Sequence, residues 1–190
     1  MNTILYIDVE TYSDIDITES GAYKYIESPE FRILIIGYAI DDNPVKIIDL
    51  ARGDEMPIEF LELLTDPNCL KVAHNAVFER LCFMRYKICI PAEQWYCTSV
   101  KAAYCGLPLS LDGVSKALDI QDKKLSSGKM LIRYFSCPCK PTITNGGRTR
   151  NLPEHALDKW AMYKEYNKYD VLAEREIYKR LEHIIIPESE

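Results

Sequence analysis

Two carboxylates near the N-terminus, Asp8 and Glu10, have the spacing of a metal-binding pair. They lie in the stretch 3–11, after an apolar run that has the pattern of a buried strand. Residues two apart on a strand point to the same face, so both acids converge on one point. Their like charges repel unless a cation or a proton relieves the repulsion. The alternative is an edge strand that runs into a solvated acidic turn, and this stretch alone does not decide between them.

Two later stretches supply further candidate ligands. Glu79 lies in the first turns of a helix predicted over 75–86, directly after a predicted strand, and ligands gather at such junctions in open α/β sheets. Tyr166 and Asp170 are four residues apart in the last predicted helix and therefore share one helical face. A phenol and a carboxylate aimed at one spot could orient a water molecule and bind a metal. Taken separately, each motif also fits a structural role, as a helix-dipole carboxylate or a surface pair.

The elements that must position these side chains form a mixed α/β pattern. Strands are predicted over 3–11, 32–41, 45–50, 69–73 and 95–97. Helices are predicted over 57–64, 75–86, 98–105, 111–118, 129–134 and 153–183. The stretch 14–29 is expected to be a polar connector with a short helical turn, and 136–152 a loop. A three-strand meander followed by alternating helices and strands predicts a mixed sheet with flanking helices and a long C-terminal helix.

Length and composition describe one globular domain that spans residues 1–190. Hydrophobic residues make up 47% of the chain and charged residues 27%. No apolar run has the length of a membrane span and the N-terminus lacks a signal-peptide pattern, so we expect a cytoplasmic chain. The 7 cysteines are odd in number and form no pair of CxxC motifs. They predict free, mostly buried thiols and neither disulfides nor a zinc site.

The charge distribution points to a polyanionic partner. The net charge is −6, but the segment 123–150 contains no acid and seven basic residues: Lys123, Lys124, Lys129, Arg133, Lys140, Arg148 and Arg150. The rest of the chain then carries 16 basic against 29 acidic side chains, a net of −13. A basic segment beside an acidic body fits a polyanion held near metal-binding carboxylates, and it fits a solvated loop as well.

The three motifs occur in an order that resembles a nuclease family. Asp-x-Glu at 8–10, Asn-x-x-Phe-Glu at 75–79 and Tyr-x-x-x-Asp at 166–170 together resemble the DEDD superfamily of 3′–5′ exonucleases, in its tyrosine subclass. The chain more closely resembles the proofreading domain of phage-type family A DNA polymerases. This similarity includes the stretches 21–25, 74–80, 106–111 and 145–155, and so it extends over nearly the whole chain.

The resemblance implies a ribonuclease H-like fold with two divalent cations, Mg²⁺ or Mn²⁺, at the site. Asp8, Glu10 and Asp170 would bind the metals directly, with Asp8 bridging both, and Tyr166 and Glu10 would orient the attacking water. The family usually has aspartate at the end of the second motif, where it acts through water. This chain has Glu79 there, and the extra methylene could alter metal spacing or affinity.

The implied reaction removes 5′-mononucleotides stepwise from the 3′ end of single-stranded DNA. Thr11 falls where the family contacts the terminal nucleotide, and Asn75 stands at the motif-two asparagine. The phosphates would be held by the basic loop segment 123–152, with these side chains: Lys123, Lys124, Arg148 and Arg150. Bases would stack on one of three tyrosines: Tyr23, Tyr25 or Tyr134.

Other functions remain open at this level. A free-standing exonuclease acting on RNA or on DNA in general would carry the same motifs, because the 2′ position is read by pocket shape. A non-catalytic nucleic-acid-binding module would be expected to have lost some acids, whereas all five functional positions here carry a competent side chain. A ribonuclease H or transposase-type endonuclease would share the fold but not the pair Tyr166 and Asp170.

The end of the chain also bears on its partners. In phage-type polymerases a similar segment leads into the polymerase domain, whereas this chain ends directly after its last predicted helix. We therefore expect a fragment of a longer polymerase, a split polymerase or a truncated gene product. The polymerase domain would be a partner in cis or in trans, in a bacterial or phage-infected cell.

Overall fold

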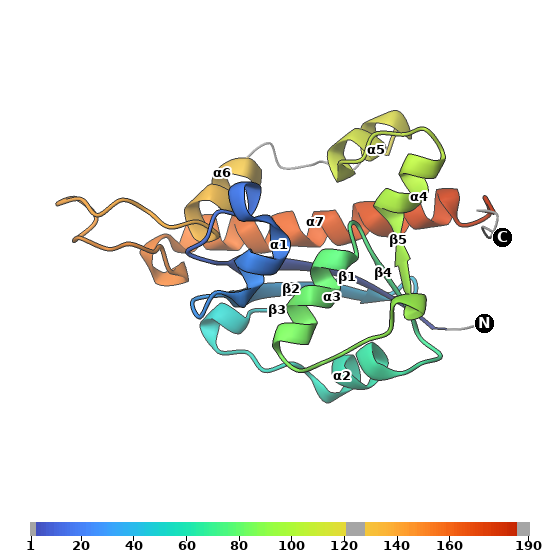
Figure 1. The fold of residues 1–190 in the computed structure, drawn as a ribbon, viewed down its shortest axis with the longest axis horizontal. Helices are drawn as coiled ribbons and strands as arrows, with labels where there is room; N and C mark the ends of the chain where they lie inside the picture. Colours follow the sequence, from blue (N-terminus) through green and yellow to red (C-terminus); the bar gives the residue numbers. More distant parts are fainter. Residues whose placement is uncertain (1–2, 121–127, 186–190) are drawn as a thin grey trace.

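A five-stranded sheet forms the centre of the computed structural model, which describes residues 3–120 and 128–185 (Figure 1). Its strands, in the order β3-β2-β1-β4-β5, are β1 (Ile4–Tyr12), β2 (Arg32–Ile40), β3 (Lys46–Ile48), β4 (Leu70–Ala73) and β5 (Trp95–Cys97). β1, β2 and β3 form an antiparallel meander, and β4 and β5 run parallel to β1. The predicted mixed α/β class is confirmed. Because β1 is the central strand, the edge-strand alternative for Asp8 and Glu10 is excluded.

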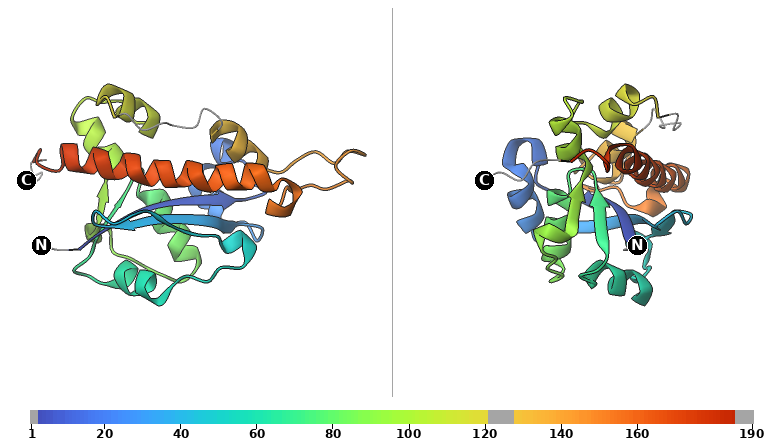
Figure 2. Two further views of the ribbon diagram at one scale, coloured as in Figure 1. Left: turned by 180° about the vertical axis from the view of Figure 1, so that it is seen from behind. Right: turned by 90° about the vertical axis from the view of Figure 1, so that its right-hand side faces the viewer.

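Helices cover both faces of this sheet (Figure 2). One face is covered by α1 (Ile17–Glu27), α2 (Ile58–Thr65) and α3 (Val77–Arg85). The other face is covered by α6 (Gly128–Phe135) and the long α7 (Leu157–Leu181). α4 (Thr98–Tyr104) and α5 (Leu111–Ala117) pack on the C-terminal half of α7. Short 3-10 turns occur at Leu50–Arg52, Ala92–Gln94 and Pro153–His155.

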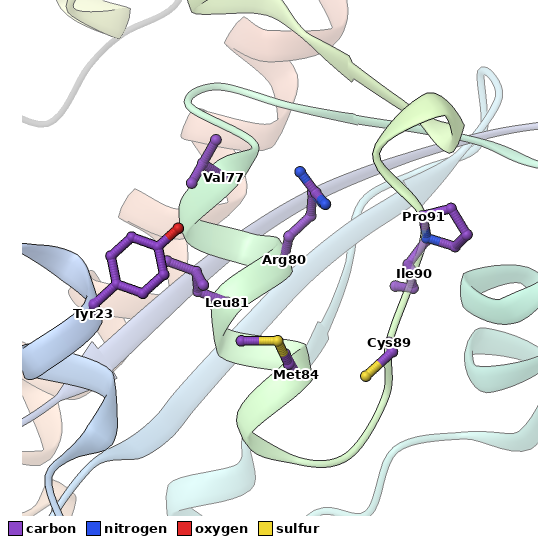
Figure 3. A pocket seen from close by; sticks show the side chains of 8 residues that line it. All are labelled: Tyr23, Val77, Arg80, Leu81, Met84, Cys89, Ile90 and Pro91. Atoms are coloured by element: carbon purple, nitrogen blue, oxygen red, sulfur yellow. The ribbon is translucent and has the colours of Figure 1, made fainter.

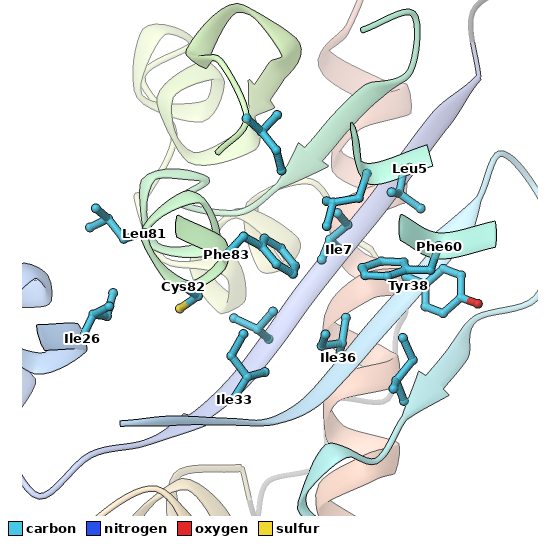
Figure 4. Close-up of a cluster of buried hydrophobic side chains, with 14 of the residues drawn as sticks. Leu5, Ile7, Ile26, Ile33, Ile36, Tyr38, Phe60, Leu81, Cys82 and Phe83 are labelled. Atoms are coloured by element: carbon cyan, nitrogen blue, oxygen red, sulfur yellow. The ribbon is translucent and has the colours of Figure 1, made fainter. Parts of the chain in front are cut away.

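The alternation of side chains along β1 decides which residues face α7. Leu5, Ile7 and Val9 enter the larger core, where they meet rings such as Phe60 and Phe83 (Figure 4). Residues of the opposite parity point to the other face. Asp8 and Glu10 therefore lie on the face of the sheet that α7 covers.

The connector 14–29 is more helical than the sequence predicts. α1 has 11 residues, and the side chain of Asp16 caps it by accepting a hydrogen bond of 2.8 Å from the amide of Thr18. Gly21, with φ of 77°, kinks the helix in its middle. A cap and a glycine kink interrupt the apolar period, so the pattern indicates only a short turn.

The last helix begins later than expected. Pro153–His155 is a separate 3-10 turn. Ala156, with an extended φ of −162°, separates this turn from α7, which starts at Leu157.

The expectation of mostly buried thiols is wrong, because only Cys69 and Cys82 are buried among seven free cysteines. Within the described ranges, no helix combines the length and apolarity needed to cross a membrane.

Candidate metal centre

Three carboxylates from β1 and α7 meet on the face of the sheet that α7 covers. One ligand atom from each of Asp8, Glu10 and Asp170 lies within 4.8 Å of the others. The parallel pairs between β1 and β4 extend only from Ile4 to Tyr6, so the acids of β1 come directly after the last of these pairs. The sequence predicts these acids at the end of the first strand. β1 instead continues to Tyr12, and the acids lie just beyond the point where its pairing with β4 ends.

Burial and mutual repulsion make this cluster electrostatically costly. Glu10 and Asp170 are 8% and 7% exposed. Burial, followed by the negative charge of Asp8, raises the pKa of Glu10 well above its usual value. A divalent cation would relieve both effects, and carboxylate oxygens are the ligands that Mg²⁺ and Mn²⁺ prefer. The residues present therefore fit a divalent metal.

Glu79 approaches the cluster from α3 without joining it. Its carboxyl group is 3% exposed, and burial and the charge of Asp8 raise its pKa well above the usual value. Its Oε2 atom has no hydrogen-bond partner among the described residues. A buried acceptor of this kind needs a donor such as water or a hydrated cation. Glu79 thus lies near enough to Asp8 to feel its charge but outside the cluster of three ligand atoms.

Tyr166 lies beside Asp170 on α7, as their spacing predicts. Burial raises the pKa of Tyr166, and Asp170 raises it further by charge and by a side-chain hydrogen bond. The phenol therefore stays protonated at neutral pH and can donate. Its ring packs directly on Gly128 of α6, where an added Cβ would lie 2.3 Å from the ring carbon Cε2.

Thr11 and Asn75, both predicted to bind substrate, have different surroundings. Thr11 is 6% exposed, and its hydroxyl shares a hydrogen bond of 2.9 Å with the hydroxyl of Tyr25. Asn75 is exposed between β4 and α3, with a positive φ of 70°. Asparagine tolerates this left-handed conformation better than most residues.

The basic residues proposed to bind phosphate have different surroundings. Lys123 and Lys124 lie outside the described residues. Arg148 is tied to its own loop through a hydrogen bond of 2.9 Å from Nε to Asn151. The guanidinium of Arg150 lies 3.8 Å from the ring centroid of Tyr12, the last residue of β1.

The three tyrosines considered for base stacking differ in access. Tyr25 is 5% exposed, so the expectation that it could stack a base is wrong. Tyr23 is 64% exposed on α1. The ammonium of Lys159 lies over the ring of Tyr134, 4.2 Å from the ring centroid.

A separate cavity of about 520 Å³ lies on the solvent side of α3 (Figure 3). Val77, Leu81 and Met84 of α3 form its floor, with Tyr23 of α1 on one side and the segment 89–91 on the other. None of the three clustered carboxylates lines it. The cavity is therefore distinct from the candidate metal centre.

Three buried polar residues on α7 are not among the site residues predicted from the sequence: Tyr163, Asn167 and Glu174. Tyr163 donates to Glu10, Asn167 donates to Asp8, and Glu174 accepts from the amide of His74. Their signal was present, because they recur at helical spacing next to Tyr166 and Asp170. What the pattern could not show is that this face of α7 is buried against the sheet.

Comparison with solved structures places the chain in a fold class. Brucella melitensis NrnC matches with a TM-score of 0.53 and 16% identity, over 94% of this chain and 72% of that one. Escherichia coli RNase D, described as an exoribonuclease involved in structured RNA processing, matches with a TM-score of 0.50 and 15% identity, over 94% and 41%. The chain has the ribonuclease H-like fold that the motifs led us to expect.

Comparison with curated proteins identifies a closer relative. The chain is 50% identical over 187 residues to a protein named DNA polymerase from Bacillus phage SP02. The match covers 98% of this chain but only 29% of that relative, so the chain spans less than a third of its length. The resemblance to a phage DNA polymerase, indicated by the motifs, is confirmed. No family model matches the chain.

Proposed function

We propose that residues 1–190 form a single 3′–5′ exonuclease domain that cuts single-stranded DNA from its 3′ end. It would be the proofreading domain of a phage-type family A DNA polymerase, in the cytoplasm of a bacterial or phage-infected cell. The observation that carries this proposal is the buried cluster of Asp8, Glu10 and Asp170 on a ribonuclease H-like sheet. The likeness to part of a phage DNA polymerase supports it, with the polymerase domain as a partner in cis or in trans.

The cofactors would be two divalent cations, Mg²⁺ or Mn²⁺. Asp8, Glu10 and Asp170 would hold them directly, and the unpartnered Oε2 of Glu79 would act through water. When bound, such ions activate a water molecule and stabilise the leaving 3′ oxygen of the scissile phosphodiester. Glutamate is one methylene longer than the aspartate usual in the family. The backbone of Glu79 would therefore lie one bond further from the ions, with its carboxylate in the same place.

The side chains of the site would orient the water and the 3′ nucleotide. Tyr166 is a neutral donor beside Asp170, so its hydroxyl can hold the attacking water in line with the phosphate. Glu10 would help to orient that water, while Tyr163 holds its Oε2 oxygen. Asn75, exposed at the start of the second motif, would contact the terminal nucleotide. Thr11 would have to exchange its bond to Tyr25 to do so through its hydroxyl.

The phosphates of the strand would be held by the basic segment. Arg150 extends this segment to the last residue of β1, where its guanidinium lies over the ring of Tyr12. Arg148 would contribute through the loop that it stabilises, together with Lys123 and Lys124. Tyr23, the most exposed of the three tyrosines, would stack a base.

A second candidate function is that of an exonuclease acting on RNA or on short oligonucleotides. RNase D is described as an exoribonuclease, and NrnC is also known in a structure described as bound to pGG, matching this chain with a TM-score of 0.52. The same carboxylates would serve either substrate, because the chemistry acts on the phosphodiester. The two candidates differ in whether the site accepts a 2′ hydroxyl.

One experiment tests both candidates. A 5′-labelled single-stranded DNA oligonucleotide and its RNA counterpart are incubated with the protein and Mg²⁺, Mn²⁺ or a chelator, with Asp8→Ala as control. We expect a metal-dependent ladder on DNA that shortens from the 3′ end and is absent in the variant. A ladder on RNA alone would support the second candidate. An intact DNA that still binds the protein would contradict catalysis.

A further inference from the structure

A second row of buried polar side chains runs along α7 beside Tyr166 and Asp170. Its members are Tyr163, Asn167 and Glu174, and their exposed fractions are 0%. At about 100° per residue, the three lie within about 40° of one another around the helix axis. Tyr163 and Asn167 each bond an acid of β1, and Glu174 bonds the junction between β4 and α3. Buried polar side chains are nearly always hydrogen-bonded, and the partners of this row indicate its role.

Tyr163 holds Glu10. Its hydroxyl donates to Glu10 Oε2 at 2.5 Å and lies 2.8 Å from the hydroxyl of Ser136. Its ring is stacked between Phe135, at 5.5 Å between centroids, and Tyr166, at 6.2 Å. The phenol therefore has little freedom to rotate. A hydrogen bond from a fixed donor also fixes the rotation of the carboxyl group that accepts it.

Asn167 holds Asp8. Its Nδ2 donates to the carboxylate oxygen Oδ2 of Asp8 at 2.6 Å and to the backbone oxygen of Asp8 at 3.2 Å. The side chain reaches β1 by crossing over Gly37, which pairs with Asp8 on β2. A Cβ at Gly37 would lie 2.2 Å from Oδ1 of Asn167. A glycine at this point of β2 is thus what makes the approach possible.

Glu174 holds the second motif. Its Oε1 accepts the amide of His74 at 3.0 Å, at the junction from which α3 and Glu79 begin. The His74 ring is fixed in turn by Thr98, at 2.9 Å, and by the backbone oxygen of Leu109, at 2.8 Å. α7 therefore connects to both other segments that carry acids, β1 and the junction before α3.

We propose that Tyr163 and Asn167 are positioning residues that set the orientation of Glu10 and Asp8 toward bound divalent cations. Glu174 plays the same part for the junction before Glu79. This inference rests on the proposed function, since it concerns the same metals. Side chains that hydrogen-bond metal ligands fix their geometry, and replacing them typically weakens metal affinity or activity by about 10- to 100-fold.

The test measures metal affinity apart from cleavage. Tyr163→Phe removes one hydroxyl and keeps the stacked ring, and Asn167→Leu removes the amide at similar size. Tyr178→Phe is the matched control, a tyrosine on α7 that is 8% exposed and lies against Tyr6 and Tyr96, away from the acids. Mn²⁺ binding is measured by isothermal titration calorimetry, followed by the Mn²⁺ concentration that gives half-maximal cleavage of single-stranded DNA.

We expect both site variants to bind Mn²⁺ about 10-fold or more weakly, and the control to bind as the wild type does. Cleavage by the variants should recover toward the wild-type rate at high Mn²⁺, which a merely structural defect would not show. Variants with unchanged affinity and unchanged metal dependence would overturn the positioning role while leaving the exonuclease intact. A wild type that binds no Mn²⁺ would overturn the proposed function as well. If Asn167→Leu does not fold, Asn167→Ser provides the same comparison.

Discussion

Gly128 of α6 and Tyr166 of α7 are in contact so close that no side chain fits between them. A Cβ at position 128 would lie 2.3 Å from Cε2 of the tyrosine ring and 2.8 Å from Cδ2. The same ring is stacked on that of Tyr163, which donates a hydrogen bond to Glu10. The position of the Tyr166 phenol therefore depends on a glycine on a helix that contributes no acid to the cluster.

Gly128→Ala should reduce cleavage by displacing this ring. Overpacking of this kind costs about 1–3 kcal/mol in the free energy of unfolding, measured by urea denaturation. The rate of single-stranded DNA cleavage should fall in parallel, because Tyr166 no longer orients water. In a Tyr166→Ala background the same glycine substitution should cost little stability, since the ring is gone. An equal cost in both backgrounds would contradict the contact.

Asp8→Ala and Asp170→Ala should each abolish cleavage while leaving the protein folded. Both acids belong to a cluster that repels itself, so removing one carboxylate should not lower the metal-free melting temperature. Gel assays of oligonucleotide cleavage and circular dichroism melts check the two statements. Full activity in Asp8→Ala would refute the metal assignment.

Tyr166→Phe should leave reduced but measurable activity. The phenol orients water but does not bind metal in the proposed mechanism, and positioned proton donors or acceptors contribute on the order of 10²-fold or more. Single-turnover rates at saturating metal isolate this effect from metal binding. Tyr169→Phe, one turn away and outside the cluster, is the control and should match the wild type. A Tyr166→Phe rate equal to the wild type would remove Tyr166 from the mechanism.

Neutralising Arg148 and Arg150 should weaken binding of single-stranded DNA chiefly at low salt. Each lost phosphate contact lowers the slope of log affinity against log salt by about 0.7 for a single strand, so the double variant should lose about 1.4. Fluorescence anisotropy over a range of salt concentrations measures that slope. Because Arg150 also packs on Tyr12, Arg150→Met, which keeps an apolar side chain there, separates lost charge from lost packing. An unchanged slope would place the strand elsewhere.

Divalent metal should remove a pH dependence of stability. Burial and repulsion raise the pKa of Glu10, Glu79 and Glu174 well above the usual 4.5. At a pH between the usual pKa and the raised pKa, the folded protein holds protons that the unfolded chain has released. The free energy of unfolding of the metal-free protein therefore falls as the pH rises through the raised pKa values. Saturating Mg²⁺ binds the ionised cluster and should flatten this fall. Urea denaturation between about pH 5 and 8, with Mg²⁺ or chelator, tests the expectation, and equal slopes would refute it.

The parts of this site that follow from local spacing could be predicted from the sequence. Two-residue spacing placed Asp8 and Glu10 on one face of a strand, and four-residue spacing placed Tyr166 and Asp170 on one face of a helix. The meander and the alternating elements gave the sheet, because apolar periodicity is a local property. The roles of these residues in catalysis stay predictions.

Other features depend on contacts between distant segments. Tyr163 and Glu10 are 153 positions apart, and no periodicity shows that they meet. The burial of Tyr25 depends on its bond to Thr11 and on the packing of α1, which a polar connector does not reveal. The break at Ala156 has no signal beyond Pro153, because proline at the start of a helix is compatible with an uninterrupted helix.

α7 presents five polar site residues, from Tyr163 to Glu174, on one continuous rod. Inserting or deleting one residue within this span would rotate everything beyond it by about 100° and turn Asp170 away from β1. Relatives of this chain should therefore vary in amino-acid identity along the span but never in its length. The loop 136–152 carries no such constraint, and insertions that alter the nucleic-acid contacts should accumulate there.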